Sequence, residues 1–320
     1  HQMQALGENF IWFNKKVEGD RKEGQSVRVG SKLTEFQAIK EYNQETGAPI
    51  SKLCDMLDVS RAGDYKWLGQ DPTTREEENE WLMVKIKEKF NQMNGVWGYR
   101  RIRMHTNRKY DKNYSKGRIR RLMLKMGLKS HIRRSNGYST QAGYRNIEPN
   151  RLDRDFTADK PNEKWVTDIT HLHYGIGKKA YLSAIKDLYD GSIVAYHVSK
   201  RNDNLLVMET LDKAIKANPE AEPLIHSDRG SQYTSKDYRR KTTEAGMTRS
   251  MSRTANCLDN ASIESFFGHF KCEKYDLNTY LTYHSLTDDI DDYMKFYNEE
   301  RYQETLNSLT PLEFRYQAAA

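Results

Sequence analysis

The sequence has few cysteines and no long apolar run, and both absences exclude classes of protein. Among 320 residues the three cysteines, Cys54, Cys257 and Cys272, stand far apart and form no CxxC pair. This spacing argues against a zinc ribbon or a disulfide framework and fits a reducing cytoplasm. No stretch approaches the ~18 apolar residues of a membrane span, and the start shows no secretory apolar segment. We therefore expect a cytoplasmic protein that does not bind membranes.

The charge balance indicates a polyanionic partner. Lys and Arg number 52 against 45 Asp and Glu, which gives a net charge of +7 and a pI near 9.0. Nucleic acid is the commonest partner for such a balance. The length of 320 residues allows two or more domains, and a hydrophobic fraction of 37% suffices for their cores. Residues 1–32 show no clear periodicity and are assigned no function.

Residues 33–72 contain a candidate helix-turn-helix, ISKLCDMLDVSRAGDYKWL. Ile50, Leu53 and Leu57 fall at helical spacing, the run then breaks, and Ser60 can cap a second helix. Two short helices about a tight turn are typical of a DNA-binding helix-turn-helix. An ordinary helical hairpin has the same periodicity, so that alternative stays open.

Residues 73–134 are predicted to form a basic helical DNA-binding region. A helix over 73–93 has acids in its first turns and apolar residues at three- and four-residue steps, which is typical of a solvated packing helix. From Asn94 to Arg134, 14 Lys or Arg residues accompany one acid. Like charges repel in the free protein, so this excess favours contact with phosphates over an ordinary solvated face. The candidate contacts, on a helix start at 98–102 and a helix over 115–127, are Arg100, Arg101, Lys116, Arg118, Arg120, Arg121 and Lys125.

The remainder of the chain predicts a linker and an α/β domain. Residues 135–162 are polar, include two prolines and are predicted to be the linker. Residues 163–275 are predicted to form three strands joined by turns, then helix, strand, helix, strand and helix. This is the order of a ribonuclease-H-like domain with a mixed five-stranded sheet, whereas a doubly wound fold would need helices between the first three strands. Residues 276–320 are predicted to be a C-terminal helical segment.

Three acidic residues occupy positions where a carboxylate is costly unless something holds it. Asp168 lies within the first predicted strand, Asp228 ends the fourth, and Glu264 lies on the last helix, with 59 and 35 residues between them. The first and fourth strands are neighbours in this fold, so we expect the carboxylates to converge. Clustered carboxylates repel, and hard divalent cations with oxygen ligands resolve the repulsion. Taken singly, each acid could instead be an exposed strand residue, a turn cap or a solvent-facing helix residue.

The blocks that contain these acids, WVTDITHL, HSDRGSQYTS and DNASIESFFGHFKCE, carry a specific resemblance. Residues 35–316 resemble the second-reading-frame protein of bacterial insertion-sequence transposases with a retroviral-integrase-like DDE core. The 35-residue gap is the spacing that this family uses. The resemblance implies a metal-dependent transposase in which Asp168, Asp228 and Glu264 hold two Mg²⁺ or Mn²⁺ ions per active site.

Further residues near the acids are candidates for the same site. The resemblance implies a basic residue seven positions after Glu264, and Lys271 stands there, on the same helical face, where it can bind a phosphate. Asn260 precedes the glutamate by four and can orient the carboxylate or touch DNA. His226 is either an active-site neighbour or a packed histidine.

The resemblance also implies a reaction and partners. The expected reaction is cleavage at the ends of a mobile element, followed by attack of the freed 3′-hydroxyl on another DNA strand. DNA is the expected partner, both at terminal inverted repeats and at the target, and synapsis of two ends implies a homo-oligomer of at least two chains. The family's first-reading-frame protein is a further candidate partner. The expected location of this chain is the bacterial cytoplasm, in association with the nucleoid. A nuclease on the same fold and a non-catalytic DNA-binding regulator are the alternatives.

Overall fold

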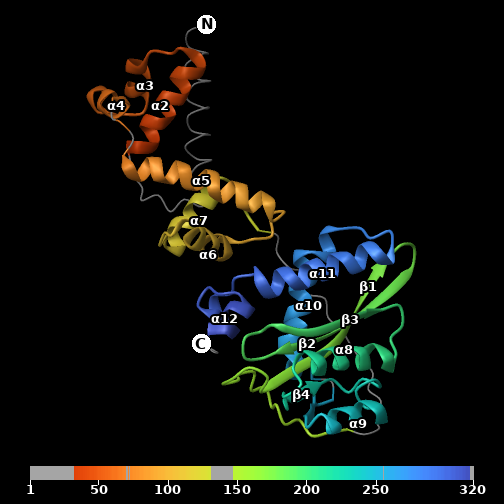
Figure 1. Ribbon diagram of the computed structural model, residues 1–320. Coiled ribbons are helices and arrows are strands. Elements are labelled where there is room, and N and C mark those ends of the chain that lie inside the picture. Colours follow the sequence, from red (N-terminus) through yellow and green to blue (C-terminus); the bar gives the residue numbers. More distant parts are fainter. Residues whose placement is uncertain (1–31, 70, 72, 131–146, 255, 318–320) are drawn as a thin grey trace. The chain divides into compact units, whose positions relative to one another are not determined.

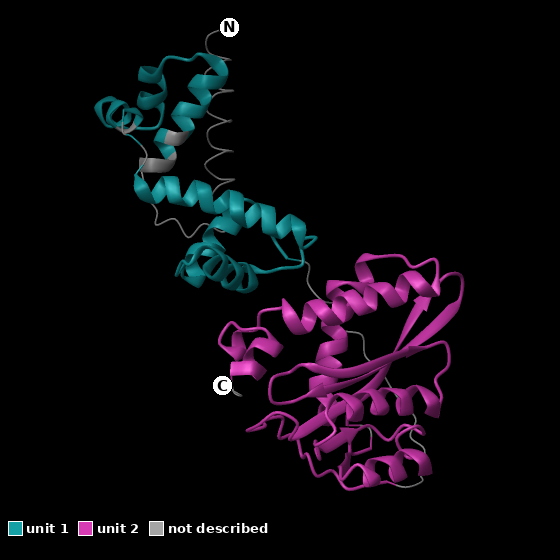
Figure 2. Cartoon of the chain, in the orientation of Figure 1, with its two compact units in different colours: residues 1–130 teal, residues 131–320 magenta. Residues whose placement is uncertain are grey.

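The computed structural model describes residues 32–69, 71, 73–130, 147–254 and 256–317; the N-terminal extension 1–31 lies outside these ranges. The chain divides into two compact units, residues 1–130 and 131–320 (Figure 2). The described part of unit 1 is helical, and unit 2 combines helices with one sheet (Figure 1). We describe each unit by itself.

Unit 1 consists of short helices whose starts the sequence marks with caps. The Thr73 hydroxyl accepts from the Glu76 N–H while the Glu76 carboxylate accepts from the Thr73 N–H, a reciprocal capping box. The Ser115 hydroxyl accepts from the Arg118 N–H at 3.2 Å and starts the basic helix as predicted. The described helices are α2 (Lys32–Thr46), α3 (Ile50–Met56), α4 (Arg61–Leu68), α5 (Thr74–Gln92), α6 (Tyr99–Tyr110) and α7 (Lys116–Lys125).

Two sets of apolar side chains hold unit 1 together. One set joins α2 and α3 through Ile39 and Leu53, both almost fully buried. The other lies among α5, α6 and α7, which pack on one another and bury Ile86, Ile102 and Ile119 completely. The predicted apolar periodicity of these helices therefore corresponds to real buried faces, with the charged residues left outside.

Unit 2 is a mixed five-stranded sheet with helices on both faces, which confirms the predicted fold class. The strands run in the order β3-β2-β1-β4-β5, with β1 antiparallel to β2 and parallel to β4. Turns join the first three strands, and helices join the later ones, as the sequence predicts. The elements are β1 (Lys164–Tyr174), β2 (Lys178–Asp187), β3 (Ile193–Ser199), α8 (Asn204–Ala217), β4 (Leu224–Ser227), α9 (Lys236–Glu244), β5 (Thr248–Met251) and α10 (Ala261–Glu273).

The alternation of side chains along β1 gives the sheet two cores. Val166 and Leu172 point into the core under α10 and α11 (Tyr283–Glu299), whereas Trp165 points into the core under α8 and α9. Figure 1 shows α10 and α11 on one side of the sheet and α8 on the other. Because side chains two residues apart share a face, Asp168 belongs to the face that α10 covers.

The segments on either side of the predicted catalytic core pack onto it. Leu152, within the expected linker 135–162, is buried in the core under α10, while residues 135–146 lie outside the described ranges. Tyr293 and Tyr297 of α11 are buried in that same core. The described parts of both segments thus belong to unit 2, together with the short helix α12 (Pro311–Gln317).

Helix α12 is attached to the sheet by a buried ionic cluster. The Arg315 guanidinium donates to Asp187 at 2.9 Å and to Asp190 at 2.7 Å, and both acids are fully buried. It also donates to the Asn162 carboxamide oxygen at 2.7 Å, just before β1. Two buried carboxylates are tolerated here because one cation and several N–H groups satisfy them.

This cluster makes a prediction about stability. Arg315→Ala would leave two buried carboxylates without their cation, so we expect the free energy of unfolding to fall by about 3 kcal/mol. Arg240→Ala is the matched control, because Arg240 is an exposed ion-pairing arginine on α9 and its loss should cost less than about 0.5 kcal/mol. Urea denaturation measures both, and equal losses would contradict the assignment.

Candidate active site

The parallel pairing of β1 and β4 places two of the predicted acids side by side. The register pairs Trp165 with Ile225 and Val166 with His226. Asp168 lies two residues after Val166, within β1, and Asp228 lies two residues after His226, directly after the end of β4. The predicted adjacency of these two strands is confirmed, and it brings both aspartates to one end of the pair on the α10 side of the sheet.

The turn after Asp228 holds that carboxylate against the backbone. The Gly230 N–H donates to Asp228 Oδ1 at 2.8 Å. A Cβ atom on Gly230 would lie 2.9 Å from the same oxygen and 3.1 Å from Gln232 Oε1, which is too close for any other residue without a shift. Any other residue at position 230 would therefore displace the Asp228 or Gln232 side chain from its place in this turn.

Helix α10 carries the third acid. Ile263 and Phe266 are fully buried on its inner side, which fixes the helix against the sheet. Glu264 is exposed, and Lys271 is half-buried, two helical turns further on. Both therefore lie on the predicted helix, outside its apolar face.

The three acids influence one another electrostatically. Burial raises the pKa of Asp168 well above its ordinary value, and the charges of Asp228 and Glu264 raise it further, whereas a backbone N–H and the Lys271 ammonium act to lower it. Burial raises the pKa of Asp228. Burial and the charge of Asp228 together raise the pKa of Glu264. The site thus holds more negative charge than its protein surroundings compensate.

A hard divalent cation fits this set of donors. Asp168, Asp228 and Glu264 offer carboxylate oxygens, and a cation would offset the burial and the repulsion that raise the pKa values of Asp168 and Glu264. No three His, Cys, Asp or Glu side chains of the described residues, however, lie close enough together to hold one ion. The convergence of the three carboxylates on one ion therefore stays a prediction.

Asn260 is buried, and its hydrogen bond goes to the backbone of β1 and not to the Glu264 carboxylate. Its side chain is only 3% exposed, and Nδ2 donates to the carbonyl of Thr167 at 3.1 Å. It therefore fixes the backbone of β1 next to Asp168 and does not lie on a surface where DNA could reach it. Its Oδ1 is buried without a hydrogen-bond partner.

His226 is a packed histidine. It is fully buried on β4, and its two ring nitrogens lie 2.8 Å and 3.0 Å from the hydroxyls of Ser250 and Ser252. Burial lowers its pKa to about 4, so the ring is neutral at physiological pH. Of the two alternatives for this residue, the structural one is correct.

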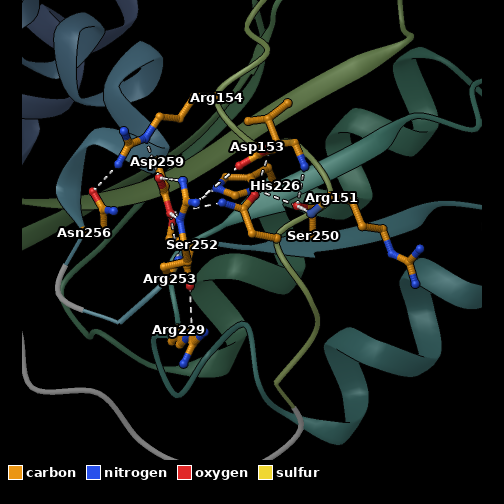
Figure 3. Close-up of polar contacts among 12 residues, drawn as sticks. Arg151, Asp153, Arg154, His226, Arg229, Ser250, Ser252, Arg253, Asn256 and Asp259 are labelled. Carbon is orange, nitrogen blue, oxygen red and sulfur yellow. Dashed lines mark hydrogen bonds and ion pairs between the residues drawn. The ribbon is translucent and has the colours of Figure 1, made fainter.

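The sequence reasoning missed an ionic cluster at the start of α10. Asp259 is fully buried and accepts from both Arg154 and Arg253 at 2.8 Å (Figure 3). These arginines come from segments about 100 and 6 residues away, and no local pattern relates the first to the aspartate. The only signal was an aspartate directly before Asn260 in a short polar run.

The basic candidates of unit 1 differ in their surroundings. Arg118 is mostly buried and pairs with Glu78 at 2.7 Å, so it connects α7 to α5. Arg101 is half-buried. The candidates whose side chains are exposed, and which can meet a phosphate, are Arg100, Lys116, Arg120, Arg121 and Lys125.

Comparison with known families agrees with this geometry. Models of the integrase core domain match residues 158–257 and 264–318, and a model of an HTH-like domain matches residues 76–136. The integrase-core match over residues 264–318 includes most of the segment 276–320. The helix-turn-helix expected over 33–72 precedes the matched region and stays a prediction. The fold is that of an integrase core preceded in the sequence by an HTH-like region.

Curated relatives identify the family. InsK, named as a candidate transposase for insertion sequence element IS150 in Escherichia coli (strain K12), is 35% identical over 272 residues, which cover 84% of this chain and 94% of the relative. The transposase for insertion sequence element IS904 in Lactococcus lactis subsp. lactis (strain IL1403) is 31% identical over 246 residues, covering 76% and 96%. This chain belongs to the IS3 family of insertion-sequence transposases. Its integrase core implies polynucleotidyl transferase activity.

A search of solved structures also finds retroviral integrases. The catalytic core domain of HTLV-2 integrase in complex with magnesium, in a dimeric form, aligns at 20% identity with a TM-score of 0.40, covering 49% of this chain and 97% of that one. Within its described ranges, this chain has no helix that is both long and apolar enough to cross a membrane.

The repulsion among the acids makes a prediction about stability without metal. Because the pKa of Asp168 is raised in the folded state, its charged carboxylate destabilises the fold. This loss of stability is complete once the pH has risen through the folded-state pKa. Asp168→Asn removes the charge, so we expect the Tm at neutral pH without divalent ions to rise by about 2–4 °C. Asp153→Asn, at an exposed aspartate, is the control and should leave the Tm unchanged. Scanning calorimetry measures both, and a lower Tm for Asp168→Asn would contradict the coupling.

Proposed function

We propose that this transposase cleaves the ends of its insertion sequence and joins the freed 3′-hydroxyl to another DNA strand, using Asp168, Asp228 and Glu264. The observation that carries the proposal is the placement of Asp168 and Asp228 at the same end of the paired strands β1 and β4, with Glu264 on α10, which packs on that face of the sheet, in a chain of the IS3 family. A role in packing alone would not require acids at these positions, because the folded structure raises the pKa of each and so disfavours its charged form.

The three carboxylates are proposed to hold two Mg²⁺ or Mn²⁺ ions. When bound, these ions would supply charge neutralisation at the scissile phosphate and activation of the attacking oxygen. The protein contributes position: the β1–β4 pairing aligns Asp168 with Asp228, and the packed inner side of α10 presents Glu264. Catalysis then depends on geometry and charge, with no covalent bond to the protein.

Lys271 and Asn260 are proposed to assist in different ways. The Lys271 ammonium acts on the pKa of Asp168, which puts its charge near the acids, where it can bind a phosphate oxygen of the DNA. Asn260 holds the β1 backbone beside Asp168 through its bond to the Thr167 carbonyl. One residue would thus bind substrate, and the other would keep an acid in place.

Unit 1 is proposed to bind the element ends through its exposed basic residues on α6 and α7. The HTH-like match over 76–136 and the excess of basic over acidic residues support this assignment. Because two ends must be brought together for transposition, we propose that at least two chains assemble on DNA. The first-reading-frame protein of the element is a candidate partner, and the domain boundaries predicted from sequence belong to the same proposal.

A strand-transfer assay with labelled element ends and Mg²⁺ tests the activity. Joined product supports transposition, nicks alone would indicate a nuclease, and tight binding without chemistry would indicate a regulator. Asp228→Asn should reduce joining by at least about 100-fold while leaving DNA affinity unchanged, because it removes a ligand and not a DNA contact. Asp237→Asn, at an exposed aspartate on α9, is the control. Joining by Asp228→Asn at the control's rate would refute the assignment.

The salt dependence of DNA binding tests the basic face. Replacing both Arg120 and Arg121 with Ala should weaken binding to an element end and reduce the slope of log K against log salt by about 0.9 for each lost phosphate contact. Lys87→Ala, at an exposed lysine of α5, is the charge-matched control for one substitution and should leave the slope nearly unchanged. Fluorescence anisotropy across a salt series measures the slope. An identical loss with Lys87→Ala would show that only net charge matters.

A further inference from the structure

A fully buried aspartate lies at the start of the helix that carries Glu264. Asp259 Oδ1 accepts from Arg154 Nε and Arg253 Nη2, each at 2.8 Å. Oδ2 accepts from Asn150 Nδ2 at 3.0 Å, from Arg253 Nε at 2.8 Å and from the Arg253 backbone N–H at 2.9 Å. Figure 3 shows the two guanidinium groups on opposite sides of this carboxylate. Charge-assisted bonds of this number are strong enough to fix a side chain.

The cluster joins three stretches of chain. Asn150 and Arg154 lie before β1, in a stretch that is itself bonded to β5 through two backbone N–H groups and the Ser250 hydroxyl. Arg253 lies in the loop after β5, and Asp259 lies in the 3₁₀ turn (Cys257–Asn260) that runs directly into α10. The carboxylate therefore attaches the first turn of α10 to the sheet edge.

A second buried pair holds the other end of α10. Glu273, in the last turn, accepts from Arg301 Nε and Nη2 at 3.0 Å each and from the Tyr293 hydroxyl at 3.1 Å. Arg301 is 3% exposed. Both ends of α10 are therefore fixed by ionic contacts, and its middle by apolar ones. Glu264 is exposed and lies five residues after Asp259, in the half of α10 nearer to the first of these contacts.

We propose that Asp259 is a positioning residue for Glu264: with Arg154 and Arg253 it fixes the start of α10, so that the glutamate stays beside Asp168 and Asp228 during strand transfer. This inference depends on the proposed catalytic role of Glu264. A carboxylate with a cation on each side resists displacement along and across the helix axis, which a single apolar contact does not. A displacement of about 1 Å in a catalytic group can lower the rate by about 100-fold.

A competing explanation is that the cluster only adds stability. The two differ in where the effect appears. A stabilising cluster would, when broken, loosen unit 2 as a whole, whereas a positioning cluster would loosen the first turn of α10 and change the rate of chemistry at saturating DNA. Asp259→Asn keeps the volume, removes the charge and replaces one accepting oxygen with a donating NH2 group, so it breaks the cluster without leaving a cavity and suits both measurements.

The test uses the full chain and combines hydrogen exchange with single-turnover joining. For Asp259→Asn we expect faster amide exchange at residues 261–264, unchanged exchange in β1 and β2, and a joining rate about tenfold or more lower with unchanged DNA affinity. Asp153→Asn is the matched control, because Asp153 contacts the same Arg253 at 3.3 Å from an exposed position. This control should show neither change.

Several outcomes would overturn the inference. Unchanged exchange at 261–264 would show that Asp259 does not hold the helix start, and uniformly faster exchange across unit 2 would show a role in stability alone. A normal joining rate with loosened exchange would show that the held position is not needed for chemistry. Glu264→Gln separates the two proposals: if this variant joins DNA normally, the catalytic role of Glu264 fails and the positioning role fails with it. If it is inactive while Asp259→Asn is normal, only the positioning role fails.

Discussion

The parallel pairing of β1 with β4 is the constraint on which the site depends. It brings Asp168 and Asp228, 60 positions apart in the chain, to the same end of two adjacent strands. Burial and the charge of Asp228 then raise the pKa of Asp168, an unfavourable arrangement that the surrounding structure must hold in place. Three contacts hold this region. The Gly230 N–H donates to Asp228, the Asn260 carboxamide donates to the backbone of β1, and the apolar side of α10 packs on the sheet.

The other buried acids of unit 2 have arginine partners. Asp259 lies between two arginines, Glu273 pairs with Arg301, and Asp187 shares Arg315 with its neighbour. Each of these carboxylates is matched by a cation within the protein, as burial of charge requires. The candidate catalytic acids carry unmatched negative charge by comparison. This contrast supports the proposal that the three acids bind an external cation, whereas the other clusters hold the fold together.

Basic residues have different surroundings in the two units. In unit 1, one basic residue of α7, Arg118, pairs with Glu78 and holds the helices together, while Arg120 and Arg121 stay exposed. In unit 2, basic residues such as Arg253 and Arg315 are bonded to acids and keep elements in register. Basic charge therefore has two uses in this chain, and only the exposed part of it can contribute to a salt-dependent affinity for DNA.

The sequence by itself determined the elements and the candidates. Alternation and turn residues predicted the strands of the sheet, caps such as Ser115 predicted helix starts, and the spacing of Asp168, Asp228 and Glu264 within three blocks predicted the family and the acids. These signals lie within short segments or at fixed spacings, so they can be recognised in one sequence without knowledge of the fold.

Only the tertiary structure decided which charges find partners. Arg154 reaches Asp259 across about 100 residues, and Asn260 is buried because β1 lies beside it. His226 is a packed residue because Ser250 on β5 and Ser252 directly after it lie beside its ring. Such contacts depend on which strands become neighbours, and hydrogen bonds between distant segments leave no periodic pattern in the sequence. The physical reason is that burial and pairing are properties of the assembled sheet, whereas helix and strand propensity are properties of short segments.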